Sequence, residues 1–389
     1  MAEMAGMKNY DVTAGQAPAA PPNGKPRPVD VREIEDAISQ LHMEHRDTGA
    51  RAYILNLLVF TSGANVSLAH AISGQVCRNY PSRAIVMEAD PVSDTTLEAA
   101  VTAQSDFADS ANTMSSEQIT LRAAGDAVSQ LPAVVAPLLI PEIPVALCCL
   151  GDVPWGLPVF DSIMNTVDQL IVDSAQFSQP LAMTERMDAV AGDQWSGVTF
   201  NDLTWARLLP WREATAQFFD VPATRPALDA IQRVSVTYAA ASGAETNPTK
   251  ALLYSGWLAS RLGWEAVRDL RRLGRDTMLV MRHGEIPVIV ECNARNTDAV
   301  PNGDLLTVTI TADPGDGTMI FHLDRSEERH SFHATITHDG QTTDERTLPR
   351  EERAPGDIVC DLVGSVRRDA VYEQALHLVV RLVGSGITE

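Results

Sequence analysis

Apolar and polar residues follow two patterns along the chain, and the first consists of continuous apolar segments. Residues 53–60, 83–88 and 143–149 are nearly uninterrupted apolar stretches of strand length. Such stretches are typical of parallel strands that are buried on both faces. The segment 65–80 carries apolar residues along one helical stripe and ends before Pro81. Strand, helix and strand in this order predict a βαβ unit with a right-handed crossover.

This alternation continues to about residue 265. We predict further strands at 118–122, 169–173 and 234–239, and helices at 127–139, 160–167, 201–219 and 252–262. Pro210 must break or kink the helix over 201–219, because its ring removes a backbone hydrogen bond. Alternating strands and helices favour a mostly parallel sheet flanked by helices.

Beyond about residue 275 the second pattern begins, in which short apolar runs alternate with turn residues. The runs cover 278–281, 288–291, 305–311, 319–323 and 332–337. Turn sequences between them, at 313–317 and 338–340, are typical of hairpins. We therefore predict an antiparallel meander, followed by a final amphipathic helix at 369–382.

Together the patterns predict an α/β fold: a mostly parallel sheet with flanking helices, followed by a smaller antiparallel β-rich part with a C-terminal helix. We place the α/β domain at residues 30–270 and the β-rich domain with its C-terminal helix at 271–389. Residues 1–29 are rich in Ala, Pro and Gly and lack apolar periodicity, which predicts a disordered tail.

A first helix follows this tail. Asp30 can cap it, because an Asp side chain accepts hydrogen bonds from the first backbone amides of a helix. The polar face of the helix carries His42 and His45, three residues apart. A metal site needs more ligands than these two, so we expect solvated surface histidines.

The composition is strongly acidic, with 30 Lys and Arg residues against 51 Asp and Glu residues and a net charge of −21. Fourteen of the acids, but only two bases, fall between residues 91 and 200. Binding of nucleic acid or anionic lipid requires a dominant positive surface. No apolar run reaches the roughly 18–20 residues that span a bilayer. We therefore expect no nucleic-acid partner and no membrane partner.

Five scattered cysteines form no CxxC pair, and the N-terminus lacks the basic start and apolar core of a secretory signal. These features predict a cytoplasmic protein with free thiols. Cys148 and Cys149 fall within the apolar run 143–149, so we expect them to act as buried small apolar residues rather than as a redox pair.

The common enzyme motifs are absent: there is no GxxxxGK[ST] loop, GxGxxG turn, GxSxG elbow or HExxH pair. The turn after the first strand, Thr61–Asn65, precedes a helix and could hold an anion on its backbone amides, although a merely capped turn is the alternative. Asp173 and Glu291 fall near predicted strand ends, where open α/β sheets bind ligands, but neither has a recognisable acid–base partner. We predict no catalytic residue, no metal site and no cofactor.

Two arginine-rich segments suit a protein partner. The first places Trp205 and Trp211 beside Arg207 and Arg212. Trp and Arg are enriched at the residues that dominate binding energy in interfaces. The alternative is a core helix whose tryptophans pack inward, with the arginine stems lying along them.

The second segment contains Arg268, Arg271, Arg272 and Arg275. Their spacing of three, four and seven places all four on one face of a predicted helix. In a chain this acidic, such a face predicts a docking site for a carboxylate-rich or phosphate-bearing partner. A solvated face neutralised by the protein's own acids is the alternative.

Residues 202–213, with the sequence DLTWARLLPWRE, and the following Phe218-Phe219-Asp220 resemble the OpcA family of glucose-6-phosphate dehydrogenase assembly proteins. Supporting segments occur in order at 81–86, 116–119, 131–141, 170–174 and 254–264. The resemblance spans roughly residues 50–265 and is weaker in the β-rich part.

The resemblance implies a non-enzymatic assembly factor that binds glucose-6-phosphate dehydrogenase. It would act as an allosteric activator by favouring the active oligomer, and so control the oxidative pentose phosphate pathway. It carries over no catalytic residues. The competing hypothesis is a sugar-phosphate-binding protein, or an enzyme, with a degenerate phosphate-binding turn at Thr61–Asn65.

Overall fold

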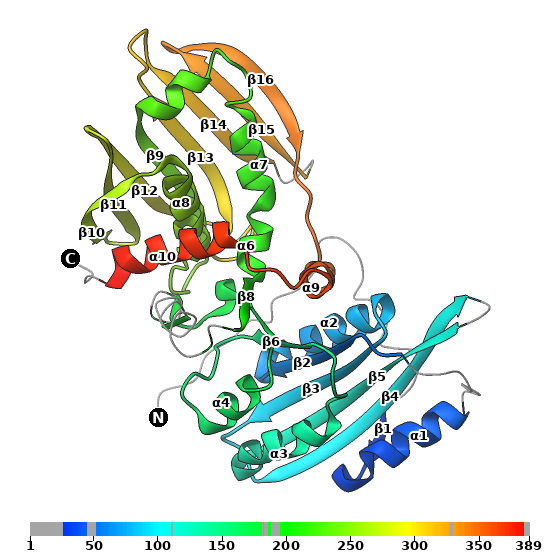
Figure 1. Cartoon of the computed structure of the whole chain (residues 1–389). Coiled ribbons are helices and arrows are strands. Elements are labelled where there is room, and N and C mark those ends of the chain that lie inside the picture. The colour runs from blue at the N-terminus through cyan, green and yellow to red at the C-terminus, as the bar shows by residue number, and fades with distance from the viewer. Residues whose placement is uncertain are drawn as a thin grey trace. The chain divides into compact units, whose positions relative to one another are not determined.

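The computed structural model describes residues 26–44, 52–109, 112–180, 182, 186–187, 195, 197–326 and 330–384. It divides into two compact units (Figure 1). Unit 1 comprises residues 1–172 and 354–366, and unit 2 comprises residues 173–353 and 367–389. The chain therefore enters unit 2 after Val172, returns to unit 1 for one short segment, and ends in unit 2.

Unit 1 is an α/β unit built around a mostly parallel sheet. Its strands are β1 (Arg27–Val29), β2 (Leu55–Thr61), β3 (Ser82–Asp90), β4 (Thr96–Asp109), β5 (Asn112–Ala124), β6 (Val145–Leu150) and β7 (Gln169–Val172). Its α-helices are α1 (Ile34–Glu44), α2 (Val66–Asn79), α3 (Leu131–Val135), α4 (Pro158–Met164) and α9 (Pro355–Gly364). Short 3-10 turns η1 (Val31–Glu33), η2 (Gly63–Asn65), η3 (Gly125–Gln130) and η4 (Ala136–Leu138) connect them.

The strands of unit 1 lie in the order β1-β4-β5-β3-β2-β6-β7, with parallel pairing from β5 to β7 and antiparallel pairing of β4 and β1 at the edge. The strand order reverses direction at β2, so right-handed crossovers place helices on both faces. Figure 1 shows α2 and α9 over one face and α3 and α4 over the other. This double cover explains the continuous apolar runs, because β6, for example, is buried along its whole length.

A buried polar cluster ties α1 to the sheet. The Glu117 carboxylate on β5 contacts His42 Nε2 at 2.8 Å and accepts from Arg83 Nε at 2.8 Å, and it also accepts from the Tyr53 hydroxyl. Arg83 pairs in turn with Glu35 on α1 at 2.5 Å. The prediction that His42 is a solvated surface residue is therefore wrong, because this ring is only 1% exposed and faces the buried acid. His45 lies outside the described residues.

Unit 2 is built around a second sheet. The strands of this sheet are β9 (Ile231–Ala240), β10 (Glu265–Leu273), β11 (Asp276–His283), β12 (Ile286–Asn296), β13 (Leu305–Ala312), β14 (Met319–Ser326), β15 (Ser331–His338) and β16 (Gln341–Pro349). Strand β8 (Thr199–Asp202) also falls in unit 2 but is not part of this sheet. The α-helices of unit 2 are α6 (Leu203–Arg207), α7 (Leu209–Gln217), α8 (Thr249–Leu262) and α10 (Ala370–Gly384), and its 3-10 turns are η5 (Ser174–Gln176) and η6 (Arg225–Ala230). The sheet has eight strands in the order β10-β11-β12-β9-β13-β14-β15-β16.

Helices of the described residues cover one face of this sheet, and side chains on the other face are partly exposed. Helices α7, α8 and α10 lie over the covered face (Figure 1). Trp211 on α7 contacts Phe332 on β15 with ring centroids 4.6 Å apart, and Phe219 contacts Phe321 on β14 at 4.7 Å. Along β9, buried Val234 and Val236 alternate with partly exposed Ser235. This alternation is the signature of a sheet that packs a core on one side only.

The fold class is confirmed, but the division of the chain differs from the predicted boundary at residue 270. Strand β9 and helix α8 belong to unit 2, where β9 pairs in parallel with β12 and antiparallel with β13. A strand followed by a helix has the same apolar pattern in either sheet. The sequence pattern therefore could not show that β9 and α8 belong to unit 2, and so could not locate the boundary between the units. Part of the predicted tail is also wrong, because residues 27–29 form β1 and pair with β4; residues 1–25 lie outside the described residues.

The packing of α8 against α10 leaves no room for a side chain at Gly256. A Cβ at this position would lie 2.6 Å from the Ala375 carbonyl oxygen and 2.8 Å from Val379 Cγ2. We predict that Gly256→Ala lowers the free energy of unfolding by about 1–3 kcal/mol, because the two helices must separate. Urea denaturation followed by tryptophan fluorescence measures this change.

Gly197→Ala, at an exposed turn position where a Cβ has no described atom within 4 Å, is the control for the exchange of glycine for alanine without a close contact. Inside α8, alanine has the higher helix propensity by about 1 kcal/mol, so propensity alone would stabilise Gly256→Ala. A Gly256→Ala protein as stable as the wild type, or more stable, would therefore contradict the close contact between α8 and α10.

Candidate functional site

The segment that carries the family resemblance forms a strand and two short helices in unit 2. Strand β8 ends at Asp202, whose side chain accepts from the Thr204 backbone amide at 2.9 Å and so caps α6. Helix α6 ends at Arg207, and α7 begins at Leu209 with Pro210 in its first turn. The predicted break at Pro210 is thereby confirmed, since proline is tolerated only where no helical amide bond is lost.

Trp205 and Arg212 stack face to face across this break. The Arg212 guanidinium lies 3.7 Å from the centre of the Trp205 ring, within cation–π range. The Trp205 indole donates to Asp369 at 2.7 Å, and the other oxygen of Asp369 caps α10 by accepting from the Val371 and Tyr372 amides. These contacts hold the indole plane in place beneath the guanidinium.

Both tryptophans of the segment lie in the core of unit 2. Trp205 is 5% exposed and Trp211 is 6% exposed. Neither indole therefore presents an aromatic surface to solvent, which is the packing described by the core-helix alternative. Arg212 is partly exposed, and the partial burial of its guanidinium lowers the pKa of that group to about 10.

Asp173 and Arg207 form a buried ion pair at the start of unit 2. Arg207 donates to both carboxylate oxygens of Asp173, at 2.7 and 3.0 Å, and the Thr204 hydroxyl donates to the same carboxylate at 3.0 Å. Burial alone would raise the pKa of Asp173, but the Arg207 guanidinium outweighs it and holds that pKa below its usual value. The predicted site residue Arg207 is thus committed to an internal acid.

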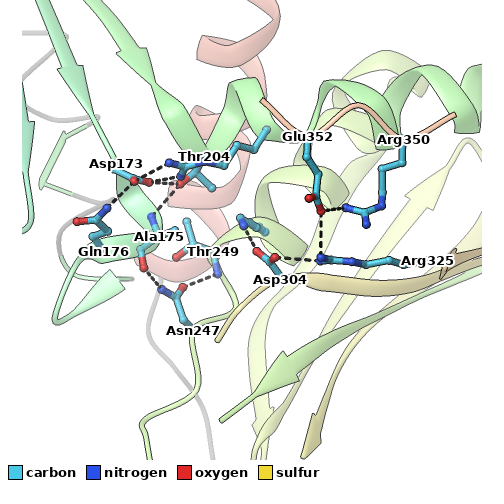
Figure 2. A network of polar contacts seen from close by, with 12 residues as sticks. Asp173, Ala175, Gln176, Thr204, Asn247, Thr249, Asp304, Arg325, Arg350 and Glu352 are labelled. Atoms are coloured by element: carbon cyan, nitrogen blue, oxygen red, sulfur yellow. Dashed lines mark hydrogen bonds and ion pairs between the residues drawn. The ribbon is translucent and has the colours of Figure 1, made fainter. Parts of the chain in front are cut away.

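A second cluster surrounds Asp304 in the same unit. The Asp304 carboxylate pairs with Lys250, in the first turn of α8, and accepts from Arg325 on β14 at 2.9 Å. Arg325 also contacts Glu352 at 3.3 Å, and Glu352 pairs with Arg350. Figure 2 shows this cluster beside Asn247 and Thr249, with the Asp173 group on the other side of Thr249. The pKa of Asp304 is lowered because Lys250 and Arg325 outweigh the effect of its burial.

Sequence reasoning missed the Asp304 cluster entirely. Its members come from α8, from the loop before β13, from β14 and from the segment after β16. No spacing rule connects residues that lie so far apart along the chain. The one available signal was Lys250 itself, because the chain has only three lysines and this one follows directly on the helix start at 247–249.

The four arginines of the second predicted segment do not share a helical face. Residues 265–273 form β10, an edge strand paired antiparallel with β11, and Gly274 turns the chain in a left-handed conformation with φ 67°. Arg271 and Arg275 are exposed, whereas Arg272 is half-buried. Arg268 lies on the same strand. The helix prediction failed because two register shifts interrupt the alternation that would have identified a strand.

The turn Thr61–Asn65 ends β2 and leads into α2. No side chain of Ser62 or Asn65 caps the helix, so the capped-turn alternative is not what the described residues show. Glu88 on β3 lies opposite Thr61 in the sheet register, but its carboxylate contacts His70 at 2.8 Å and Arg122 at 2.9 Å. This acid is therefore already paired within unit 1.

The remaining candidate groups are paired within the fold or buried. Glu291 pairs with Arg233 at 2.6 Å. All five cysteines are free and buried, as predicted for Cys148 and Cys149, and burial raises the pKa of Cys77, Cys292 and Cys360 to about 11. Within the described ranges, no three His, Cys, Asp or Glu residues gather as a metal site. In the same ranges no helix has the length and apolar character needed to span a membrane.

The fold is one that solved proteins share. The structure resembles that of a mutant of KijD10, a 3-ketoreductase from Actinomadura kijaniata solved with TDP-benzene and NADP, with a TM-score of 0.50 and 11% identity. The match covers 86% of this chain and 98% of that chain. At this identity the likeness shows the fold alone, and it defines the class: a protein with an α/β unit and a second, large sheet.

Within that class, two domains of one protein family match the sequence in order. The glucose-6-phosphate dehydrogenase subunit N-terminal domain of OpcA matches residues 73–189, and the corresponding C-terminal domain matches residues 198–376. Together they cover about three quarters of the chain. The chain belongs to the OpcA family, and the resemblance seen in the sequence is confirmed.

Cyanobacterial relatives carry the same family name. Proteins named "Putative OxPP cycle protein OpcA" are 28% identical in Synechococcus elongatus, over 68% of this chain, and 34% identical in Nostoc punctiforme, over 41% of it. The matched regions are 58% and 32% of the length of those proteins. The chain therefore spans less than two thirds of the relatives that it matches.

Asp202 gives the site a testable dependence on pH. Burial, followed by the nearby charge of Asp173, raises the pKa of Asp202 to about 6 despite the hydrogen bond from the Ser174 hydroxyl. The folded state then binds a proton more tightly than the unfolded state, so the stability contributed by Asp202 is lost as the pH rises through 6. Asp202→Asn keeps a good capping side chain but has no proton to lose. We predict that its free energy of unfolding, relative to that of the wild type, increases by up to about 3 kcal/mol as the pH rises from 4 to 7.

Urea unfolding at a series of pH values measures this difference. Asp220→Asn, at an exposed position after α7, is the control for removal of one negative charge. A constant difference between Asp202→Asn and the wild type from pH 4 to pH 7 would contradict the raised pKa.

Proposed function

We propose that this protein is a non-enzymatic assembly factor that binds glucose-6-phosphate dehydrogenase and favours its active oligomer. The observation that carries the proposal is the ordered match of both OpcA domains, which are described as domains of a glucose-6-phosphate dehydrogenase subunit. The pairing of Asp173, Asp304 and Glu88 with internal cations supports a non-catalytic role, because each of these acids is engaged within the fold.

Activation of this kind requires preferential binding. A partner shifts an equilibrium between inactive and active oligomers only as far as it binds the active one more tightly. The protein would therefore act as an allosteric activator of the dehydrogenase and, through it, control the oxidative pentose phosphate pathway. We propose the cytoplasm as the place of this action.

We propose that the arginine-rich segments form the docking surface. Arg271 and Arg275 on the edge of the second sheet offer exposed charge. Arg212, with Arg207 and Trp205 and Trp211 behind it, offers a guanidinium whose plane is already fixed by stacking. Planar guanidinium groups recognise carboxylates through paired hydrogen bonds, and prior ordering lowers the entropic cost of binding. Arg268 and Arg272 lie along the same strand as Arg271.

The test combines the purified protein with the dehydrogenase of the same organism. We expect the mass distribution in sedimentation velocity to shift to a larger complex, and the KM for glucose 6-phosphate to fall. If neither the oligomeric state nor the KM changes, the proposed function is contradicted.

Variants then test the docking surface separately. Arg212→Lys keeps the charge but loses the planar fork, and the double variant Arg271→Glu/Arg275→Glu reverses the exposed charge. We expect each to weaken binding by about threefold to tenfold, the range for exposed charges at an interface. Arg225→Glu, at an exposed position away from both segments in the sequence, is the matched control. If all these variants bind the dehydrogenase as tightly as the wild type, the proposed docking surface is contradicted, whereas the proposed function is not.

A further inference from the structure

Strand β10 is the last strand of the second sheet, and no other strand of the described residues pairs with its outer edge (Figure 1). Gly274 and Arg275 form the two-residue turn that joins it to β11, between the opposed residues Leu273 and Asp276. Residues that flank such a turn bond each other and the pattern then alternates, so the amide and carbonyl of Arg272 point away from β11. In the described ranges neither group has a hydrogen-bond partner. Such an edge is a template for a further strand.

The strand and its turn carry positive charge that the fold leaves available. Residues 265–275 contain four arginines and two acids, in a chain whose net charge is −21. One of these acids, Glu265, is already paired with Arg282 at 2.5 Å. Three of the arginines form no ion pair with a carboxylate of any described residue, namely Arg271, Arg272 and Arg275.

Apolar side chains of the same strand are also exposed. Val267 is 51% exposed and Leu273 is 57% exposed. Charged side chains and bulges commonly protect edge strands from pairing, and β10 has both, since two register shifts interrupt its ladder. The arginines therefore exclude strands of like charge, whereas the exposed apolar side chains favour a strand of opposite charge that removes them from water.

A second copy of this chain does not suit the edge. Two β10 strands side by side would place arginine against arginine, and like charges opposite each other destabilise a strand pair. The strand at the other end of the sheet, β16, has acids that are already engaged. Asp344 pairs with Arg346 at 3.0 Å, and Glu345 contacts His333 at 2.8 Å. The strand that complements β10 is thus an acidic one from another protein.

We propose that β10 binds an extended acidic segment of a partner protein, which joins the sheet as a further strand. The backbone of this segment bonds the amide and carbonyl of Arg272. Its acidic side chains pair with Arg271 and Arg275, and its apolar side chains cover Leu273. Strand addition takes its affinity from backbone bonds and its specificity from alternate side chains.

This inference rests on the proposed function in that it uses arginines of the proposed docking surface. It adds the mode of binding, which is strand addition, and the chemistry of the bound segment, which is acidic and extended. Both can be tested with a peptide, without the dehydrogenase.

The test uses the full chain and two labelled decapeptides, one of alternating Glu and Val and the other of alternating Lys and Val. The two peptides carry the same apolar residues and opposite charges. We expect saturable binding of the Glu-Val peptide in fluorescence anisotropy, at least tenfold tighter than binding of the Lys-Val peptide. Added sodium chloride should weaken this binding, because salt screens exposed charges.

Hydrogen exchange followed by mass spectrometry distinguishes strand addition from contact through side chains alone. We expect amides of residues 265–275 to exchange more slowly when the Glu-Val peptide is bound, because outward-facing amides then have acceptors. Amides of β16, at the other end of the sheet, are the internal control and should exchange as before.

Two variants at one position separate the backbone from the charge. Arg272→Gln removes the charge alone, whereas Arg272→Pro removes the charge and the outward-facing amide. Proline is tolerated on an edge strand where the amide points outward. We expect Arg272→Gln to bind the Glu-Val peptide about threefold more weakly than the wild type. We expect Arg272→Pro to bind it about fivefold to tenfold more weakly again, the range for one lost hydrogen bond.

Thermal unfolding shows whether Arg272→Pro is folded, and the exchange measurement on the wild type decides the question if it is not. The proposal is overturned if the Glu-Val peptide gives no saturable binding, if both peptides bind alike, or if exchange at 265–275 is unchanged in the complex. A folded Arg272→Pro protein that binds as tightly as Arg272→Gln overturns it too. None of these measurements involves the dehydrogenase, so their failure and a failure of the proposed function are separate results.

Discussion

The ion pair between Asp173 and Arg207 is the interaction on which the architecture of unit 2 depends. Asp173 is the first residue of that unit, and it is completely buried. A carboxylate in this position is tolerable because two guanidinium bonds, the Thr204 hydroxyl and the Gln176 side-chain amide satisfy it. A buried charge with its partner removed costs about 3–5 kcal/mol. The pair joins the chain at its entry into unit 2 to the end of α6, and so sets the position of the Trp205–Arg212 stack that follows.

Most of the α/β part could be predicted from the sequence, because strands that are buried on both faces consist of continuous apolar residues. Such runs predict strands β2, β3 and β6, and an apolar stripe at helical spacing predicts α2. Helix α8 of unit 2 is also predicted, at 252–262. Strand β4 was missed, since its mixed polar sequence lies at the antiparallel edge, and helix α9 was missed, since only ten residues carry its signal. The arginines of β10 fit a helical spacing and so predict a helix, because two register shifts interrupt the alternation that would indicate a strand.

In the candidate site, too, features set by neighbouring residues could be predicted, whereas contacts between residues far apart in the sequence could not. The break at Pro210 and the cap at Asp202 are local, and the first was predicted from proline geometry alone. The pairing of Asp173 with Arg207 joins residues 34 apart, and that of Lys250 with Asp304 joins residues 54 apart. Such partners cannot be named without the fold. Burial also reversed one expectation, since Trp205 and Trp211 suggested an exposed aromatic surface and lie in a core.

The return of the chain to unit 1 for α9 has a consequence for biosynthesis. Helix α9 packs on α2, where the Gly356 backbone comes close to Gln75 and Tyr80 donates to the Cys360 carbonyl. Because α9 lies near the end of the sequence, a chain emerging from the ribosome must complete nearly all of unit 2 before α2 receives its cover. The first part to be synthesised is thus among the last to be finished, and its apolar helix face stays open to chaperones, or to aggregation, throughout translation.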